Sequence, residues 1–333
     1  MQIDFLTVFI AVLSLVVLAV PGYLLVKGKL LPEKAGEAFS TLVLYGAQPV
    51  LVFMSFQKDY TPEIAINILI IAAITIVVHF AMFGLVALIV RNKNNEEKKK
   101  VVRYACCFSN CGYMGLPFLQ MLLSGTDYGS EVIIYAAMVI AIFNVFNWTV
   151  GVFMITKDKK EMSFKKVILN PTIIAVIIGA LYFFIVQKPI VSLAATGTQL
   201  SSALNKIMNS LDSFGNMVTP LAMVVIGMRL ANVNLKQLFL DKWAYFVCFM
   251  KLIIMSLVTM IVVSFLPISP VVKYAAFFLF SMPSATSTTL FAVKYNSDGD
   301  SASVFTLLTT VMSIVTIPLM FLLFSGVFGV VIV

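Results

Sequence analysis

The sequence predicts an all-α integral membrane protein, and three observations carry this prediction. Hydrophobic residues make up 61% of the 333 residues and charged residues only 11%, whereas a soluble domain carries about 25% charged residues. The mean hydropathy is +1.02. The apolar residues form long continuous runs, which favours helices over the alternating pattern of a membrane barrel. A bilayer is therefore the solvent that fits this composition.

Ten of these runs are long enough to cross a membrane, because a spanning helix needs roughly 20 mainly apolar residues. We expect the helices at residues 3–26, 37–56, 63–90, 101–123, 131–155, 167–186, 213–231, 242–266, 271–293 and 301–330.

The positive charges predict the orientation of these helices. Most of the 23 Lys and Arg residues follow odd-numbered helices. The exceptions are Lys58, Lys188, Lys206 and Lys273, which follow even-numbered ones, and Lys251, which lies inside helix 8. The positive-inside rule then places the odd-numbered connections in the cytoplasm and both termini outside. The net charge of +8 is thereby explained as an orientation signal, and it requires no nucleic-acid partner.

Ten helices divide into two halves of five, residues 1–155 and 156–333. Because five is odd, the second half enters the membrane in the opposite direction, as in the inverted repeats of many transporters. The fourth helix of each half is interrupted, at 110–117 in helix 4 and at 282–289 in helix 9. We expect the two broken helices to cross in the middle of the membrane.

Proline and glycine predict where helix 4 opens. Pro117 lacks an N–H group, and Gly112 and Gly115 tolerate non-helical backbone and close approach. In helix 9, Pro283 is followed by hydroxyl side chains that can satisfy freed backbone groups. The N-termini of the half-helices would carry exposed N–H groups and partial positive charge, which suits an anionic ligand. The alternative is a simple kink, but two breaks at matching positions favour a binding site.

The motif Asn110-x-Gly-x-x-Gly-x-Pro117 resembles that of the fourth helix in the auxin efflux carrier family, which includes bacterial malate and malonate carriers. Supporting matches occur in order along nearly the whole chain: Asn170-Pro171 with Gly179, Thr219-Pro220-Leu221 with Gly227-Met228-Arg229-Leu230, Met282-Pro283-Ser284-Ala285 with Ala292-x-Lys-Tyr295, and Ser313 with Pro318. The resemblance implies a scaffold bundle and a transport bundle, with the substrate where helices 4 and 9 cross. Unlike plant auxin carriers, the chain has no large loop between helices 5 and 6.

Other polar residues inside the predicted helices have two interpretations each. Lys251 either balances a carboxylate or stands in for a bound Na⁺, or it extends along its stem to the membrane surface. His79 either titrates near neutral pH or packs as a satisfied core residue, and the second interpretation is favoured. Asn144, Asn147 and Gln48 either join helices or contact substrate. The candidate substrate-binding residues are thus Asn110, Gly112, Gly115, Pro117, Pro283, Ser284, Thr286, Ser287, Thr288, Asn144, Asn147, Gln48 and Lys251.

The function we expect is secondary active transport of a small organic anion, such as malate, malonate or an auxin-like carboxylate, across the plasma membrane by alternating access. No Walker-type motif is present, and no cofactor or metal is expected. A single histidine and the lack of mid-span aspartates argue against an intramembrane protease. The alternatives are a bile-acid-type sodium/organic anion symporter and, without transport, a channel or membrane sensor. The coupling ion (H⁺ or Na⁺) and a homodimeric state are left open.

Overall fold

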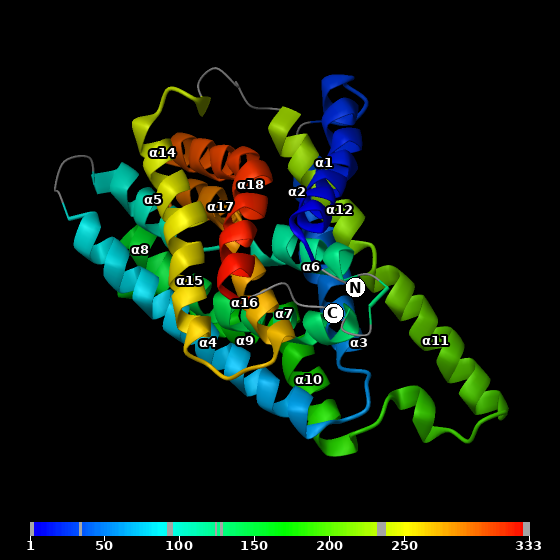
Figure 1. Cartoon of the computed structure of the whole chain (residues 1–333). Helices are drawn as coiled ribbons and strands as arrows, with labels where there is room; N and C mark the ends of the chain where they lie inside the picture. Colours follow the sequence, from blue (N-terminus) through cyan, green and yellow to red (C-terminus); the bar gives the residue numbers. More distant parts are fainter. Residues whose placement is uncertain are drawn as a thin grey trace.

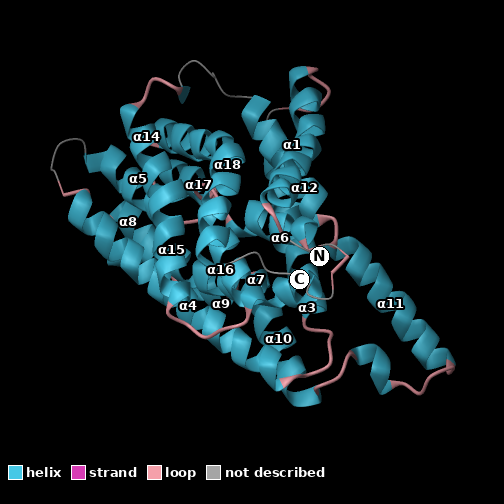
Figure 2. Cartoon of the chain, viewed as in Figure 1, coloured by secondary structure: helices cyan, strands magenta, loops and turns pink. Residues whose placement is uncertain are grey.

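The computed structural model describes residues 3–32, 35–91, 96–123, 125–126, 129–231 and 238–328. Within these ranges no β-strand forms, and helices are joined by loops and turns (Figures 1 and 2). The α-helices are α1 Phe5–Lys27, α2 Ala35–Leu42, α3 Gln48–Ser55, α4 Pro62–Ile89, α5 Glu96–Cys107, α6 Leu116–Leu122, α7 Gly129–Phe146, α8 Val152–Thr156, α9 Phe164–Ile168, α10 Pro171–Val186, α11 Gln199–Gly215, α12 Val218–Ala231, α14 Lys242–Cys248, α15 Met255–Ser264, α16 Pro270–Ser281, α17 Ser287–Lys294 and α18 Gly299–Phe328.

Short π-helical and 3₁₀ segments connect several of these helices. The π-helical segments are η1 Val43–Ala47, η2 Cys111–Gly115, η3 Asn147–Gly151 and η6 Phe249–Ile254, and the 3₁₀ segments are η4 Lys159–Glu161 and η5 Ile190–Leu193. Two of the π-helical segments precede a proline that has no N–H group to donate, namely Pro49 in α3 and Pro117 in α6. A wider turn accommodates such a residue without ending the helix.

Eight continuous helical segments in the described residues are long and apolar enough to cross a membrane. They are Phe5–Lys27, Ala35–Ser55, Pro62–Ile89, Glu131–Thr156, Pro171–Leu193, Gln199–Ala231, Lys242–Ser264 and Gly299–Val327. The two expected helices missing from this set, 101–123 and 271–293, are those predicted to be interrupted. The all-helical membrane fold is confirmed, and eight of its spans are continuous.

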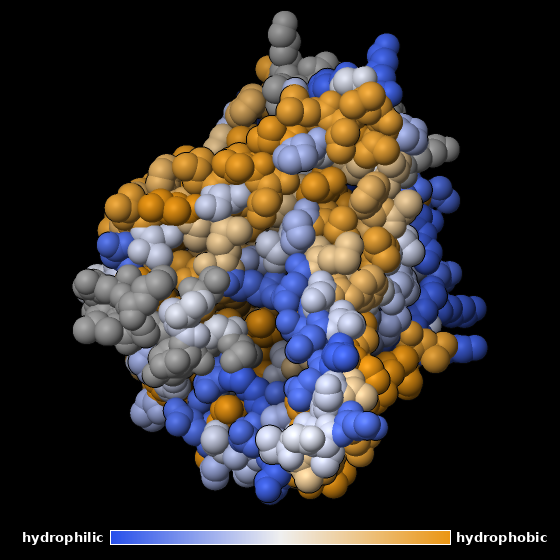
Figure 3. Space-filling view, turned by 90° about the vertical axis from the view of Figure 1, so that its right-hand side faces the viewer, coloured by the Kyte–Doolittle hydropathy of each residue, from blue (hydrophilic) through white to orange (hydrophobic). Residues whose placement is uncertain are grey.

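The surface of these helices is itself apolar. Leu6, Val17 and Leu24 of α1 and Ile185 of α10 are each more than half exposed. Figure 3 shows broad continuous apolar areas over the upper part of one face, with polar residues gathered elsewhere on it. Large exposed apolar areas of this kind mark contact with lipid or another protein.

Glycines bring α1 and α12 into backbone contact. A Cβ atom added to Gly22 would lie 2.0 Å from the carbonyl oxygen of Val224, and one added to Gly227 would lie 1.9 Å from that of Ala19. Small residues at such a crossing let two membrane helices approach closely. Helix α11 buries only Met208 and Gly215 and extends away from the other helices (Figure 1, lower right).

Two groups of helices can be distinguished by their packing. In the first, α1 packs on α12, and α3 packs on α10 and α11. In the second, α4 packs on α7, while α18 packs on α14 and α17. Contacts of α6 with α1 and α12, and of α7 with α3 and α10, connect the groups. Helix α18 also contacts α1 of the first group. Of the interrupted helices, α5 packs on α4 and α16 packs on α7, so both join the second group.

Candidate functional site

The two helix interruptions lie against each other. Helix α5 ends at Cys107 and helical structure resumes at Cys111, while α16 ends at Ser281 and α17 begins at Ser287. An isolated antiparallel bridge pairs Ser109 with Ser284. In this bridge the N–H of Asn110 donates to the carbonyl of Pro283 at 2.8 Å, and the N–H of Ala285 donates to that of Phe108 at 2.9 Å.

Both breaks are narrower than the sequence motifs suggested, and the first also lies nearer the N-terminus than predicted. We predicted interruptions over 110–117 and 282–289, but the non-helical residues are 108–110 and 282–286. Gly112, Gly115 and Pro117 therefore lie in helical backbone after the first break, and that part of the prediction is wrong. The cause is the antiparallel pairing of the two breaks, which satisfies the backbone of a few residues only and returns the rest to helix.

Side chains satisfy the carbonyl groups at the ends of the half-helices, which have no partner within their own helix. The hydroxyl of Ser284 donates to the carbonyl of Ala105 at 2.8 Å. The carbonyl of Phe280 accepts from Ser109 Oγ at 3.3 Å and from Lys251 Nζ at 2.9 Å. Lys251 is fully buried, so its side chain does not extend to the membrane surface. The Lys251 amino group therefore donates to a carbonyl near the C-terminal end of α16.

A threonine from a third helix supports the second break. Thr309 of α18 accepts a hydrogen bond from the N–H of Ser284 at 3.1 Å, through its hydroxyl oxygen. The same hydroxyl lies 2.8 Å from the carbonyl of Phe305 in its own helix. Ser109 and Thr309 were not among the predicted residues, and Ser109 was detectable as a hydroxyl residue directly before Asn110, as hydroxyls follow Pro283.

The glycines of the helix 4 motif make room for neighbours. A Cβ atom on Gly112 would lie 3.1 Å from Nε2 of Gln48, so the structure brings these two predicted residues together. A Cβ atom on Gly115 would lie 2.8 Å from Leu279 Cδ2 and 3.2 Å from Met282 Cγ. Gln48 is 2% exposed, which makes it a buried amide in contact with the segment that follows the first break.

Tyr104 joins three elements beside the crossing. Its hydroxyl is bonded to the side-chain oxygen of Asn147 in η3 and, at 2.7 Å, to the hydroxyl of Ser287 at the start of α17. Tyr104 and Asn147 are both buried. The predicted residues Asn147 and Ser287 are thus connected through a tyrosine that was not among the predicted site residues.

Asn144 is directed to a different neighbour. Its Nδ2 donates to the carbonyl of Ile140 at 2.9 Å, and its Oδ1 accepts from Asn170 at 3.5 Å. Asn170 caps α10 by accepting from the N–H of Thr172. These bonds favour the helix-joining role of Asn144 over substrate contact.

Several buried polar atoms around the crossing have no hydrogen-bond partner in the described residues. They are Asn110 Nδ2, Ser281 Oγ, Thr288 Oγ1 and His79 Nε2. Asn110 and Thr286 precede the two half-helices, and neither side chain caps its helix. Because a buried polar group without a partner is costly, such atoms are candidates for contact with a polar ligand.

His79 contacts both breaks through aromatic packing. Its Nδ1 atom lies 2.8 Å from the carbonyl of Thr75, and its ring packs against Phe108 of the first break and Phe280 at the end of α16. These contacts support packing in the core, but the ring is not fully satisfied, because its Nε2 atom has no hydrogen-bond partner among the described residues. In the described part of the chain, no group of three or more His, Cys, Asp or Glu side chains is arranged to hold a metal ion.

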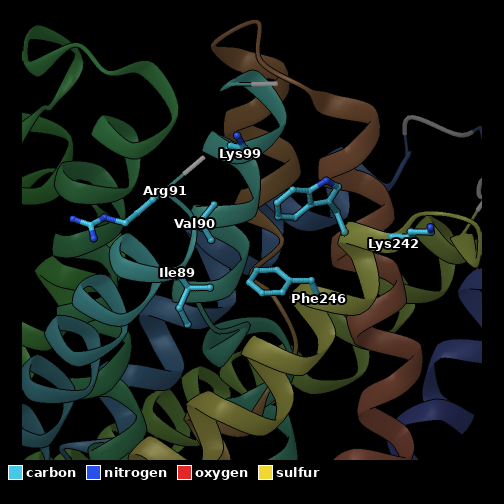
Figure 4. Close-up of a pocket in the computed structure, with 7 residues that line it drawn as sticks. Ile89, Val90, Arg91, Lys99, Lys242 and Phe246 are labelled. Atoms are coloured by element: carbon cyan, nitrogen blue, oxygen red, sulfur yellow. The ribbon is translucent and has the colours of Figure 1, made fainter. Parts of the chain in front are cut away.

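A pocket of about 300 Å³ lies elsewhere, at the ends of α4 and α14 (Figure 4). None of the predicted site residues lines it.

The fold and the paired breaks define a multi-pass membrane protein of the class in which two interrupted helices meet inside a helical bundle. The model of the membrane transport protein family matches residues 7–321. The chain therefore belongs to this family, the auxin efflux carrier family, and it is a membrane transporter. A search of the curated proteins found none that matches the chain.

Proposed function

We propose that this protein is a secondary active transporter that carries a small organic anion, such as malate, malonate or an auxin-like carboxylate, across the plasma membrane. The observation that carries this proposal is the pairing of the two breaks around Ser109 and Ser284. Backbone that is irregular inside a membrane fold is tolerated only where protein or a cavity surrounds it, and such breaks form substrate sites in other transporters.

The charges and unpaired atoms near the breaks support an anionic substrate. Lys251 supplies a buried amino group that donates to the carbonyl of Phe280, and among the described residues it forms no ion pair with a carboxylate. We propose that it carries its positive charge when the anionic substrate is bound. Asn110 Nδ2 and Thr288 Oγ1 are buried without partners in the same part of the chain. A carboxylate offers oxygens that accept from such groups and a negative charge that offsets the ammonium. Asn110, Thr288, Ser287 and Lys251 are the residues we place closest to the substrate.

The proposed mechanism is alternating access between two bundles. The chain folds as ten transmembrane helices in two inverted repeats, residues 1–155 and 156–333, with both termini outside. The group containing α4, α7, α16 and α17 is the transport bundle, and the group containing α1, α3, α10 and α12 is the scaffold. Movement of one against the other would expose the crossing first to one side and then to the other.

A sodium/organic anion symporter of the bile-acid type is the second candidate. It is supported by the same paired breaks, but the Lys251 amino group already lies near the C-terminal end of α16, where carbonyl groups would suit a sodium ion. Dependence of ligand binding on Na⁺ separates the two candidates.

The first experiment measures the thermal stability of the purified protein with malate, malonate, succinate and indole-3-acetate, each with and without Na⁺. A ligand that binds the folded state raises its stability, by about 2.7 kcal/mol at 100 times its dissociation constant. We expect one carboxylate class to raise the unfolding temperature without Na⁺. A shift that requires Na⁺ supports the symporter, and no shift with any acid contradicts an organic-anion substrate.

Transport by variants locates the site. Asn110→Ala is expected to abolish uptake of the acid found above while leaving membrane insertion unchanged. Asn205→Ala, on the exposed helix α11, is the matched control and keeps normal uptake. Normal uptake by Asn110→Ala would contradict the proposal that the substrate binds where the two breaks cross.

A further inference from the structure

The pocket between α4, α5 and α14 combines aromatic walls with positive charge. It is lined by Ile89, Val90, Arg91, Lys99, Lys242, Trp243 and Phe246. The Trp243 and Phe246 rings pack edge to face, with centroids 5.7 Å apart and an angle of 85° between their planes. Figure 4 shows the Phe246 ring facing Val90, with Lys99 above and with Arg91 and Lys242 extending outward on opposite sides.

The pocket lies where two membrane spans end. Ile89 is the last residue of one candidate span, and Lys242 is the first residue of another. Arg103 fixes the end of α4 by donating to the carbonyl of Val90 through Nη2 at 2.6 Å and Nε at 3.2 Å. This position is the boundary between lipid and water, whichever side of the membrane it faces.

Three of the seven lining residues are cationic and none is acidic. Three acidic side chains of the adjoining segments lie beside cations that do not line the pocket. Asp241 pairs with Lys98 at 2.7 Å and also accepts from the N–H of Trp243. Glu97 pairs with Lys100, and Glu96 lies 3.9 Å from Arg103. Arg91 and Lys242 form no ion pair among the described residues. The rim of the pocket therefore carries two positive charges, and the favoured ligand is an anion.

The apolar part of the pocket continues onto the outer surface of the helices. Leu88 and Ile89 of α4 are 63% and 50% exposed, and Phe249, the first residue after α14, is 54% exposed. A soluble anion would leave these surfaces unused. An amphiphile would place its charged group among the cations and its acyl chains along Leu88 and Phe249. Basic pockets between helices at the membrane surface bind anionic lipid head groups in this way.

We propose that this pocket is a binding site for an anionic phospholipid. Arg91 and Lys242 lie at opposite edges of the pocket, and their exposed side chains reach the head group by rotating inward, while Trp243 and Phe246 hold the glycerol and upper acyl region. The site touches α5, which leads directly to the break at Ser109, so a bound lipid would hold α5 against α4 and α14. The proposal requires the membrane-embedded fold but not the proposed transport function, and its test does not use transport.

The two tryptophans of the chain allow a direct test. In Trp148→Phe, Trp243 is the only tryptophan, and its fluorescence is quenched at short range by lipid carrying bromine on its acyl chains. The protein is reconstituted with brominated phosphatidylglycerol or brominated phosphatidylcholine at equal mole fractions. Each cation near the surface favours an anionic lipid by about fivefold, so we expect phosphatidylglycerol to associate with Trp243 at least about fivefold more strongly. Equal quenching by the two lipids would overturn the proposal.

Matched variants separate this site from the general charge of the protein. Arg91→Gln and Lys242→Gln are added to the Trp148→Phe protein, which leaves the buried Lys99 in place. We expect them to lower the preference of the Trp243 site for phosphatidylglycerol over phosphatidylcholine to a ratio close to one. Lys159→Gln, Lys160→Gln and Lys165→Gln together remove three exposed charges elsewhere and are expected to leave the preference unchanged. An equal loss in this control would show a general surface effect and contradict a specific site.

Two further readouts fix the place and the chemistry of the ligand. In Trp243→Phe, the remaining Trp148 lies 5.5 Å from the Lys166 ammonium and 5.4 Å from that of Lys294, so it reports the general attraction of the basic surface. Its preference should not change when Arg91→Gln and Lys242→Gln are added, and an equal loss there would overturn the assignment. Glycerol 3-phosphate should reverse the quenching no more than NaCl of equal ionic strength. Specific reversal would show that a soluble anion binds and would overturn the choice of a lipid.

Discussion

Ser109 and Ser284 have equivalent roles in the two helix breaks. Their backbones pair in an antiparallel bridge, and each hydroxyl donates to a carbonyl near the end of the helix that precedes the other serine. Ser284 bonds to Ala105 of α5, and Ser109 bonds to Phe280 of α16. This exchange satisfies polar groups that lipid would leave without partners. The crossing is thus held together by two small side chains as well as by backbone bonds.

The hydrogen bonds of the Ser109 and Ser284 hydroxyls differ in how easily they can be replaced, and this difference leads to the first prediction. Phe280's carbonyl also accepts from Lys251, whereas Ser284 supplies the side-chain bond to Ala105. Ser284→Ala should lower the free energy of unfolding by about 1–3 kcal/mol, the cost of a buried polar group without its partner. Ser109→Ala should cost less, because the ammonium remains. Unfolding measured in the same detergent for both variants checks the order.

Ser213→Ala is the control for the serine variants, because Ser213 lies on exposed α11 and bonds to its own helix at Asn209. Its effect should stay within about 0.5 kcal/mol. A larger loss for Ser109→Ala than for Ser284→Ala would contradict the unequal roles of the two serines.

The second prediction concerns Lys251. Replacing a buried charge with an apolar side chain of similar size is often neutral or stabilising, so Lys251→Met should leave the unliganded protein at least as stable. If the ammonium binds the substrate carboxylate, the variant should bind that acid roughly tenfold or more weakly, since charge-assisted hydrogen bonds are the strong ones. Thermal unfolding measures the stability, and calorimetric titration with the acid that stabilises the native protein most measures the binding.

Lys206→Met removes an equal charge from exposed α11 and should change neither quantity. The opposite pattern for Lys251→Met, lower stability with unchanged binding, would make Lys251 a structural cap of α16 and remove it from the substrate site.

The third prediction tests the α1–α12 contact. A methyl group at Gly227 would overlap the carbonyl of Ala19, and overpacking of this kind costs about 1–3 kcal/mol. Gly227→Ala should therefore lower the unfolding temperature. Gly84→Ala in α4 is the control, because a Cβ atom there meets nothing within 4 Å. It should stabilise the helix by about 0.5–1 kcal/mol. The unfolding temperatures of both variants test this prediction. A higher unfolding temperature for Gly227→Ala would contradict close backbone contact between α1 and α12.

The sequence was sufficient for the helical membrane fold, because apolar run length is a local signal, and for assigning one break to each of the two interrupted helices. It was insufficient for the extent of the breaks and for the partners that hold them. Ser109 meets Phe280, and Tyr104 meets Ser287, across more than 170 residues. Local patterns carry no information on such distant pairs. Gly112 and Gly115 allow close packing in a helix, where we expected unwinding.

The last prediction concerns Tyr104, whose hydroxyl connects α5 to Asn147 and to Ser287. Tyr104→Phe removes both bonds and leaves a buried amide oxygen and a hydroxyl to find other partners, so it should cost about 1–3 kcal/mol. If Tyr104 and Asn147 act on each other, their effects will not add. The double variant with Asn147→Leu should then show a coupling energy of about 0.5–3 kcal/mol, as for other residues in direct contact.

Tyr182→Phe is the matched control for this cycle, because the Tyr182 hydroxyl is buried without a hydrogen-bond partner in the described residues. Its removal should be neutral or slightly stabilising, which separates the lost bonds from the loss of a hydroxyl as such. Since Ser287 begins the half-helix after the second break, Tyr104→Phe should also reduce uptake of the transported acid more than it reduces the amount of folded protein. Additive effects of the two substitutions, together with normal uptake per folded molecule, would show that Tyr104 only fills space beside the crossing.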